Sequence, residues 1–238
     1  MTKFSRKLFD VHEYPIKSDK LVFVFTAMGT RFWAYRWFVW RLNRRGYSVI
    51  LYDYSTETVL NPTLAKWQDF FRKITIDAQS RLAKYQKLGA TNFYSYGVSM
   101  GTLLANYFAR QTREIHHVIL NLTYGDVATN IFTCKLVKRA RENFEKQDVN
   151  EKTLRENIKY MNPPDSAAGL KNKKVLLYLA RHDRKILAFD QARETLKSFR
   201  EADLDLTYVE NRHFGHYVNG IKNLINVAKT DKFFRGQK

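Results

Sequence analysis

The chain is poor in the residues that build disulfide scaffolds and membrane spans. It has 238 residues and one cysteine, Cys134, so it cannot form an internal disulfide framework and fits a reducing compartment. No run approaches the roughly 18 uncharged apolar residues that a membrane-spanning helix needs. Residues 1–10 are basic but lack the apolar stretch of a signal peptide. We therefore expect a cytoplasmic protein, with residues 1–238 forming a single domain around one large core.

Metal and phosphate-binding patterns are also missing from the sequence. One cysteine and six scattered histidines give no metal-ligand spacing. There is no glycine-rich phosphate loop and no nucleic-acid-binding motif. We expect no metal, no other cofactor and no specific nucleic-acid partner.

Acidic residues are scarce: the chain has 23 Asp and Glu compared with 41 Lys and Arg, which gives a formal net charge of +18. The excess lies in the flanking thirds of the chain, with 16 basic and 7 acidic residues in 1–90, and 15 and 8 in 166–238. It is spread singly over predicted helices and loops and forms no tract. Spread charge is more typical of a solvated surface than of a binding footprint. Weak attraction to an anionic membrane remains as the alternative, and the sequence leaves the oligomeric state open.

Apolar strand-like runs alternate with segments of helical spacing over most of the chain. Four strand-then-helix units in succession predict an α/β fold with a mostly parallel sheet covered by helices on both faces. After an interruption, two further strands with their helices complete the pattern. The predicted strands are 21–26, 48–54, 92–97, 117–122, 174–180 and 204–209, and the predicted helices are 31–43, 61–89, 101–111, 188–199 and 216–229.

Two of these helices carry apolar stripes that we expect to face the core. Trp33, Trp37 and Trp40 share one helix face by their spacing, with substrate contact by some of them as the alternative. In the last predicted helix the residues expected to point inward are Val218, Ile221, Leu224, Ile225 and Ala228.

The strand–helix alternation stops between residues 125 and 165. This stretch is highly charged and has scattered apolar positions at helical spacing, and it ends at Asn162-Pro163-Pro164-Asp165, a strong helix breaker. We predict a small helical cap inserted over the carboxyl edge of the sheet. The alternative is a pair of surface helices that only connect two strands.

The segment Gly97-Val98-Ser99-Met100-Gly101 carries the strongest functional signal. It is a G-x-S-x-G sequence placed where a predicted strand gives way to a predicted helix. A sharp strand-to-helix turn strains the backbone of the serine, so the residues two before and two after it must lack bulk. The turn lifts the hydroxyl of Ser99 above the edge of the sheet, which makes Ser99 a candidate nucleophile.

A serine nucleophile needs a base and a group that orients the base. His216 and Asp183 both follow later predicted strands, where ligands gather in open parallel sheets. We favour His216 as the base because Gly215 leaves the loop room to aim it, with His213 as the alternative base.

The acid has alternatives too. The order serine, Asp183, His216 is the chain order of one known class of triad. Asp126, just past the predicted strand 117–122, is the alternative acid. In another interpretation Asp183 only forms surface ion pairs with its basic neighbours, which are Arg181, Arg184 and Lys185.

The chain resembles an α/β-hydrolase from about Leu21 to its last predicted helix. The features that carry the resemblance are the serine turn from Gly97 to Gly101 (the nucleophile elbow), the loop around Asp183 and the Gly215-His216 pair. The resemblance implies a serine hydrolase with Ser99 as nucleophile, His216 as general base and then acid, and Asp183 orienting the imidazole. Similar family members cleave carboxylic esters, lysophospholipids or acyl thioesters.

An oxyanion hole needs two donors. The backbone N–H of Met100 follows the serine, and the N–H of Met28 is the best candidate for the second, since Gly29 lets the backbone approach. The chain departs here from the family's usual His-Gly pair, because Thr26-Ala27 stands in its place.

These observations predict a cofactor-independent serine hydrolase that cleaves a small-molecule or lipid-like carboxylic ester or thioester through an acyl-enzyme. One alternative is a non-catalytic α/β-hydrolase-like binding module. The other is an acyltransferase that uses the same triad.

Overall fold

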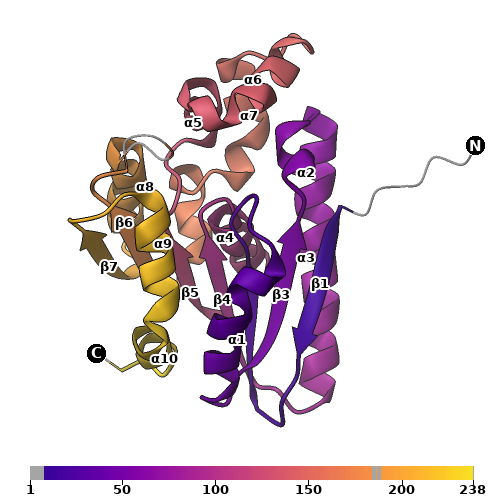
Figure 1. Ribbon diagram of the computed structural model, residues 1–238, viewed down its shortest axis with the longest axis vertical. Helices are drawn as coiled ribbons and strands as arrows, with labels where there is room; N and C mark the ends of the chain where they lie inside the picture. The colour runs from indigo at the N-terminus through magenta and orange to yellow at the C-terminus, as the bar shows by residue number, and fades with distance from the viewer. Residues whose placement is uncertain (1–7, 184–185, 187–188, 238) are drawn as a thin grey trace, which may run out of the picture.

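The computed structural model describes residues 8–183, 186 and 189–237 (Figure 1). Seven strands form one sheet in the order β1-β3-β2-β4-β5-β6-β7. β1 is antiparallel to β3, and every other neighbouring pair is parallel. The predicted α/β architecture with a mostly parallel sheet is therefore confirmed. The strands are β1 (Phe9–Tyr14), β2 (Lys20–Phe25), β3 (Ser48–Tyr54), β4 (Asn92–Val98), β5 (Ile115–Asn121), β6 (Lys174–Ala180) and β7 (Asp205–Asn211).

Helices cover both faces of the sheet and enclose two hydrophobic layers. One layer packs α3 and α4 against the sheet around Phe23, Phe71 and Phe108. The other packs α1 and α10 against the opposite face around Tyr96 and Phe234. The α-helices are α1 (Arg36–Asn43), α2 (Thr56–Leu60), α3 (Leu64–Lys87), α4 (Gly101–Gln111), α5 (Val127–Thr133), α6 (Lys138–Glu145), α7 (Glu151–Ile158), α8 (Phe189–Glu201), α9 (His216–Ile225) and α10 (Val227–Phe234), and the 3-10 helices are η1 (Phe32–Tyr35), η2 (Lys135–Val137), η3 (Lys159–Met161) and η4 (Pro164–Leu170).

The central strands are fully buried because their sequences are continuous apolar runs. Leu21 to Phe25 of β2 are all buried, as expected for a parallel strand covered on both faces. The predicted last helix, 216–229, is two helices instead of one. It breaks at Asn226, whose side chain accepts a hydrogen bond from the Lys229 N–H and so caps α10.

Residues 125–165 hold α5, η2, α6, α7, η3 and the first two residues of η4. In Figure 1 the helices α5 to α7 lie together at the top of the molecule, above the end of the sheet to which β3 points. Apolar side chains bury them against the rest of the chain, with Ile131, Phe144, Leu154 and Ile158 all buried in the larger hydrophobic layer.

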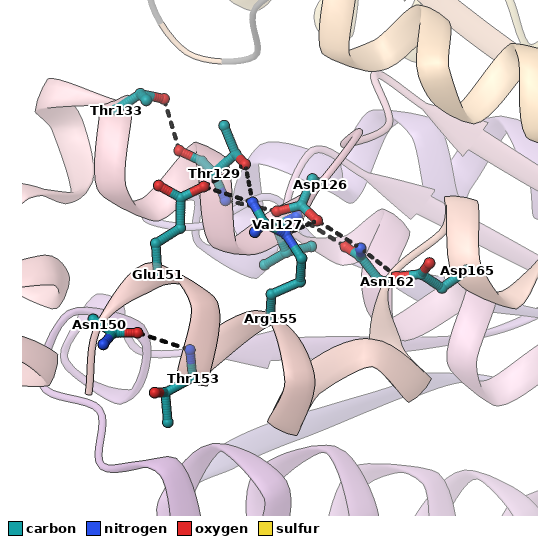
Figure 2. A network of polar contacts seen from close by, with 10 residues as sticks. All are labelled: Asp126, Val127, Thr129, Thr133, Asn150, Glu151, Thr153, Arg155, Asn162 and Asp165. Carbon is teal, nitrogen blue, oxygen red and sulfur yellow. Dashed lines mark hydrogen bonds and ion pairs between the residues drawn. The ribbon is translucent and has the colours of Figure 1, made fainter.

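A polar network joins α5 to α7 (Figure 2). The Asp126 carboxylate caps α5 by accepting from the Thr129 N–H at 2.7 Å and pairs with Arg155 of α7 at 2.9 Å. Arg155 also contacts Glu151 at 2.6 Å. Asn162 donates to Asp126 and accepts from the Val127 N–H. The network therefore fixes α5, α7 and the Asn162 turn as one unit.

Two predicted helix orientations are wrong. Trp33, Trp37 and Trp40 were expected in the core, but they are 63%, 44% and 49% exposed. Phe38, Val39 and Leu42 form the buried face of α1 instead.

In α9 the predicted inward face points outward. Val218, Ile221 and Ile225 are exposed, whereas the helix buries His216, Asn219, Gly220 and Asn223. Ala228, in α10, is also exposed, and Leu224 is partly buried. The helical spacing was right, but it does not say which face meets the protein.

Candidate active site

Ser99 stands at the turn between β4 and α4. Its φ is 50°, in the left-handed region where a non-glycine residue is strained. A Cβ on Gly97 would lie 2.4 Å from the carbonyl oxygen of Gly101, and a Cβ on Gly101 would lie 2.1 Å from that of Phe25. Neither position has room for a side chain, so the two glycines allow the turn that presents the serine.

The structure brings Ser99, His216 and Asp183 into one hydrogen-bonded chain. His216 Nε2 lies 2.9 Å from Ser99 Oγ, and His216 Nδ1 lies 2.5 Å from Asp183 Oδ2. If Nδ1–H donates to the carboxylate, Nε2 is left to accept the serine proton. All three side chains are buried. The remaining carboxylate oxygen, Asp183 Oδ1, accepts from the Ile186 N–H at 3.1 Å.

A network around Asn121, at the end of β5, holds the base in place. Its carbonyl oxygen accepts the Ser99 N–H at 2.9 Å. Its side chain donates to the carbonyl oxygen of Gly220 and accepts from Asn223 at 2.7 Å, both in α9. The elbow and the helix that begins with His216 are thus tied to the same strand end.

Tyr124 is a site residue that the sequence analysis missed. Burial raises the pKa of its phenol well above the ordinary value, and a side-chain hydrogen bond with Ser99 offsets this only in part. Tyr124 also lines the cavity that opens at Ser99. The available signal was its position, just after a buried strand, where ligands gather in such sheets.

The alternative residues lie elsewhere. His213 is exposed, and its ring contacts Phe214. Asp126 binds Arg155 and Asn162, as Figure 2 shows, and burial, which alone would raise its pKa, is outweighed by those contacts and the Thr129 N–H, so its pKa lies below the ordinary value.

Asp183 is a buried residue. It is 4% exposed and its carboxylate contacts His216. Arg181 pairs with Glu210 at 3.6 Å. Arg184 and Lys185, the other basic neighbours, lie outside the described residues.

The reason given above for favouring His216 is wrong, even though His216 is the histidine that meets the serine. Gly215 has φ −78° and ψ −170°, an extended conformation open to any residue. A Cβ there would have its nearest neighbour at 3.8 Å. The loop therefore needs no glycine at this position.

Met28 and Met100, the predicted oxyanion donors, both lie at the same end of the sheet as Ser99. Met100 is the N-cap residue of α4, whose dipole favours negative charge beside Ser99. Met28 and Gly29 occupy a turn closed by the Thr30 N–H and the Ala27 carbonyl, with Gly29 at φ 76°. The neighbouring Ala27 N–H is already used, since it donates to the Tyr35 hydroxyl at 2.8 Å.

A cavity of about 220 Å³ opens at Ser99 and His216. Its other walls are mostly apolar and come from the Met28 loop with η1, the segment 127–141, α9, and residues that follow β5 and β6. The lining includes Tyr35, Leu122, Tyr124, Cys134, Val137 and Leu224. A second, larger cavity of about 400 Å³ around His12 and Asp53 does not include Ser99.

Within residues 8–183, 186 and 189–237, no group of three or more His, Cys, Asp or Glu side chains could hold a metal ion. No helix of that same part is both long and apolar enough to cross a membrane.

The sheet order and the position of the serine elbow define an α/β-hydrolase fold, and solved structures agree. The carboxyl esterase of Bacillus coagulans, solved with glycerol, matches with a TM-score of 0.65 and 12% identity over 97% of this chain and 99% of its own. The acetyl xylan esterase of Paenibacillus sp. R4 matches with a TM-score of 0.70 and 11% identity, over 100% of this chain and 87% of its own. The monoacylglycerol lipase of Paleococcus ferrophilus matches with a TM-score of 0.60 and 14% identity, over 95% of this chain and 99% of its own.

No protein-family model and no curated protein sequence matches the chain. The similarity to solved structures establishes the fold: this chain has the α/β-hydrolase fold over its whole length.

Proposed function

We propose that this protein is a serine hydrolase that cleaves a carboxylic ester or thioester through an acyl-enzyme. The observation that carries the proposal is the hydrogen-bonded chain from Ser99 Oγ through His216 to Asp183, in which both His216 contacts are 2.9 Å or shorter. The structural neighbours that are esterases and a lipase support the same class of reaction.

In the proposed acylation step, His216 Nε2 takes the Ser99 proton as Oγ attacks the carbonyl carbon. The N–H groups of Met100 and Met28 stabilise the oxyanion. As the tetrahedral intermediate collapses, the C–O or C–S bond to the leaving group breaks. His216 returns the proton to the departing alcohol or thiol.

Deacylation repeats these steps with water. His216 removes a proton from the water that attacks the acyl-enzyme, and the carboxylic acid leaves as Ser99 regains its proton. Asp183 holds the imidazole in the required tautomer and stabilises its cation.

We also propose that the segment 125–165 acts as a cap, because Cys134 and Val137 from it line the cavity.

The cavity is small beside the roughly 300–1,000 Å³ typical of small-molecule sites. It suits a short or medium acyl chain, with a longer substrate extending out between the cap and α9. A panel of p-nitrophenyl esters of rising chain length, with an acyl-CoA alongside, will define the preference.

The direct test is labelling with a fluorophosphonate followed by mapping of the adduct. We expect a single adduct at Ser99, and a drop of about 10⁴-fold or more in kcat for Ser99→Ala and for His216→Ala. His213→Ala is the matched control and keeps wild-type activity. An unlabelled Ser99, or full ester hydrolysis by Ser99→Ala, would refute the proposal.

A further inference from the structure

Exposed large hydrophobic side chains are concentrated in three segments of the chain that each contribute to the wall of the active-site cavity. Most of those in the described chain lie in residues 31–45, 127–141 and 212–229, which we call the α1–α9 face. They are Trp33, Trp37, Trp40, Leu136, Phe214, Tyr217, Val218, Ile221 and Ile225. Single exposed apolar residues are ordinary, but a contiguous group marks an interaction surface.

The apolar residues of α9 are exposed because its polar side has a specific partner. Asn219, Gly220 and Asn223 face the protein, where Asn223 bonds to Asn121. A helix of a protein surface normally does the reverse and exposes its polar face. In α1 the inward face is apolar in the usual way, yet its outward face still presents tryptophans. Both helices lie on the same side of the sheet, toward the viewer in Figure 1.

The α1–α9 face is also strongly cationic. Residues 31–45 contain five arginines, 127–141 contain four Lys or Arg, and 212–229 contain three, whereas none of the three segments contains Asp or Glu. Some of these cations are paired with acids outside the face, as Arg139 is with Glu57. Arg36 and Arg44 are exposed and form no ion pair with another described residue.

The cations and aromatic rings are interleaved. The guanidinium of Arg41 stacks 5.2 Å from the Trp37 ring centre, and that of Arg44 lies 5.3 Å from the ring of Trp40. On α9, the ammonium of Lys222 lies 5.7 Å from the ring of Phe214. Aromatic rings with an apolar body and polar edge, beside Lys and Arg, are the combination found at the headgroup level of membranes.

All three segments meet at the mouth of the active-site cavity. Ala34 comes from η1, Leu136 from the segment 127–141, and Tyr217 and Ile221 from α9, and all four line it. The exposed apolar surface is therefore continuous with the wall of the cavity that holds Ser99.

We propose that the α1–α9 face docks on an anionic phospholipid membrane, with the mouth of the cavity turned toward the lipid. The absence of acidic residues from these segments fits a negatively charged partner. It disfavours a second copy of the chain, because a symmetric contact would set the same arginines against each other. The tryptophan stripe and the apolar side of α9 favour a lipid surface over an acidic protein, since they provide a row of interfacial aromatic and aliphatic side chains.

The test is co-sedimentation of the full chain with vesicles of phosphatidylglycerol and phosphatidylcholine, compared with vesicles of phosphatidylcholine alone. We expect binding to the anionic vesicles that weakens as salt is raised. The double variant Trp37→Ser/Trp40→Ser and the double variant Val218→Ser/Ile225→Ser each weaken it about tenfold or more. Arg36→Gln/Arg44→Gln weakens it by about fivefold for each arginine removed.

Matched controls lie on α3 and at its C-cap residue Leu88, on the opposite face of the sheet. Ile76→Ser/Leu88→Ser removes two exposed apolar side chains there, and Lys66→Gln/Lys87→Gln removes two exposed charges. Both controls keep wild-type vesicle binding. None of the substituted residues lines the cavity, so all variants keep their activity on a water-soluble p-nitrophenyl ester.

Three results would overturn the docking proposal: no binding to anionic vesicles at low salt, equal losses in the α3 controls, or a dimer that the α1–α9 variants dissociate and that does not bind vesicles. Docking does not use the nucleophile, so Ser99→Ala binds vesicles like the wild type. A failure of docking and a failure of the hydrolase proposal are thereby separated.

Discussion

At the residue scale, the two elbow glycines are close to backbone atoms that cannot move aside. A Cβ on Gly101 would clash with the carbonyl group of Phe25, at the carboxyl end of β2. We predict that Gly101→Ala lowers the free energy of unfolding by about 3 kcal/mol, the upper range for forcing extra atoms into a packed site. Urea unfolding followed by circular dichroism measures the change.

Gly215→Ala is the control for this substitution. Its Cβ would have open space and an ordinary backbone conformation, so we expect a cost below about 1 kcal/mol. Equal costs for the two substitutions would mean that the elbow relaxes around the added methyl group.

The phenol of Tyr124 is the second feature with a consequence at this scale. Its buried side chain lines the cavity that holds Ser99, and a neutral phenol can donate a hydrogen bond there. We predict that Tyr124→Phe lowers kcat about tenfold or more and leaves KM nearly unchanged, as for loss of a donor used mainly in the transition state.

Tyr178→Phe is the matched control, because its buried hydroxyl has no hydrogen-bond partner among the described residues. It leaves kcat unchanged. If Tyr124→Phe does the same, Tyr124 only fills space at the site.

At the scale of elements, the Asp126 network joins α5 to α7 (Figure 2). The pKa of Asp126 is lowered in the folded state, so its contribution to stability is fully present above the ordinary aspartate range and is lost as the pH falls through the lowered value. We predict that Asp126→Asn costs about 1 kcal/mol at pH 7, a modest value because the Arg155 side chain is 41% exposed.

The difference between Asp126→Asn and the wild type should shrink as the pH falls below about 4. Thermal unfolding between pH 3 and pH 7 measures it. Asp69→Asn breaks an exposed pair on α3. Because contacts with Lys73 and Arg72 lower the pKa of the Asp69 carboxyl too, this variant should show the same trend with a smaller amplitude. A pH-independent difference would assign the effect of Asp126→Asn to packing alone.

The elements also show how far the sequence could predict this protein. The central parallel strands were predictable because their sequences are largely apolar, and the elbow was predictable because its two glycines have a steric reason. The outward apolar side of α9 was not. Its buried side is polar, and only the presence of Asn121 on β5 makes that arrangement favourable.

Some residues of the candidate site were also predictable from the sequence, and others were not. The chain order of Ser99, Asp183 and His216 could be read from strand ends, and the structure brings the three together. The position of Tyr124 just after a buried strand was the available signal, but nothing in the neighbouring sequence shows that its side chain lies in the same cavity as Ser99. The roles of Met28 and Met100 remain predictions.

At the scale of the whole molecule, the net charge of +18 acts against the folded state. Compaction brings like charges closer, and added salt screens their repulsion. We predict that raising NaCl from about 0.02 to 0.2 M increases Tm by a few degrees, the shift expected of roughly 1 kcal/mol in a chain of this size. Sucrose of matched osmolality is the control, and an equal rise with sucrose would exclude screening as the cause.

Cys134 gives the molecule a ready-made reporter. It is the chain's single thiol and it lines the cavity next to Ser99. A thiol-reactive dye can therefore reach only one place in the protein, and its rate of attachment measures how often that place is open. Substrates, product acids or lipid vesicles that occupy or open the entrance of the cavity would each change the rate of dye attachment. No engineered cysteine is needed for this measurement.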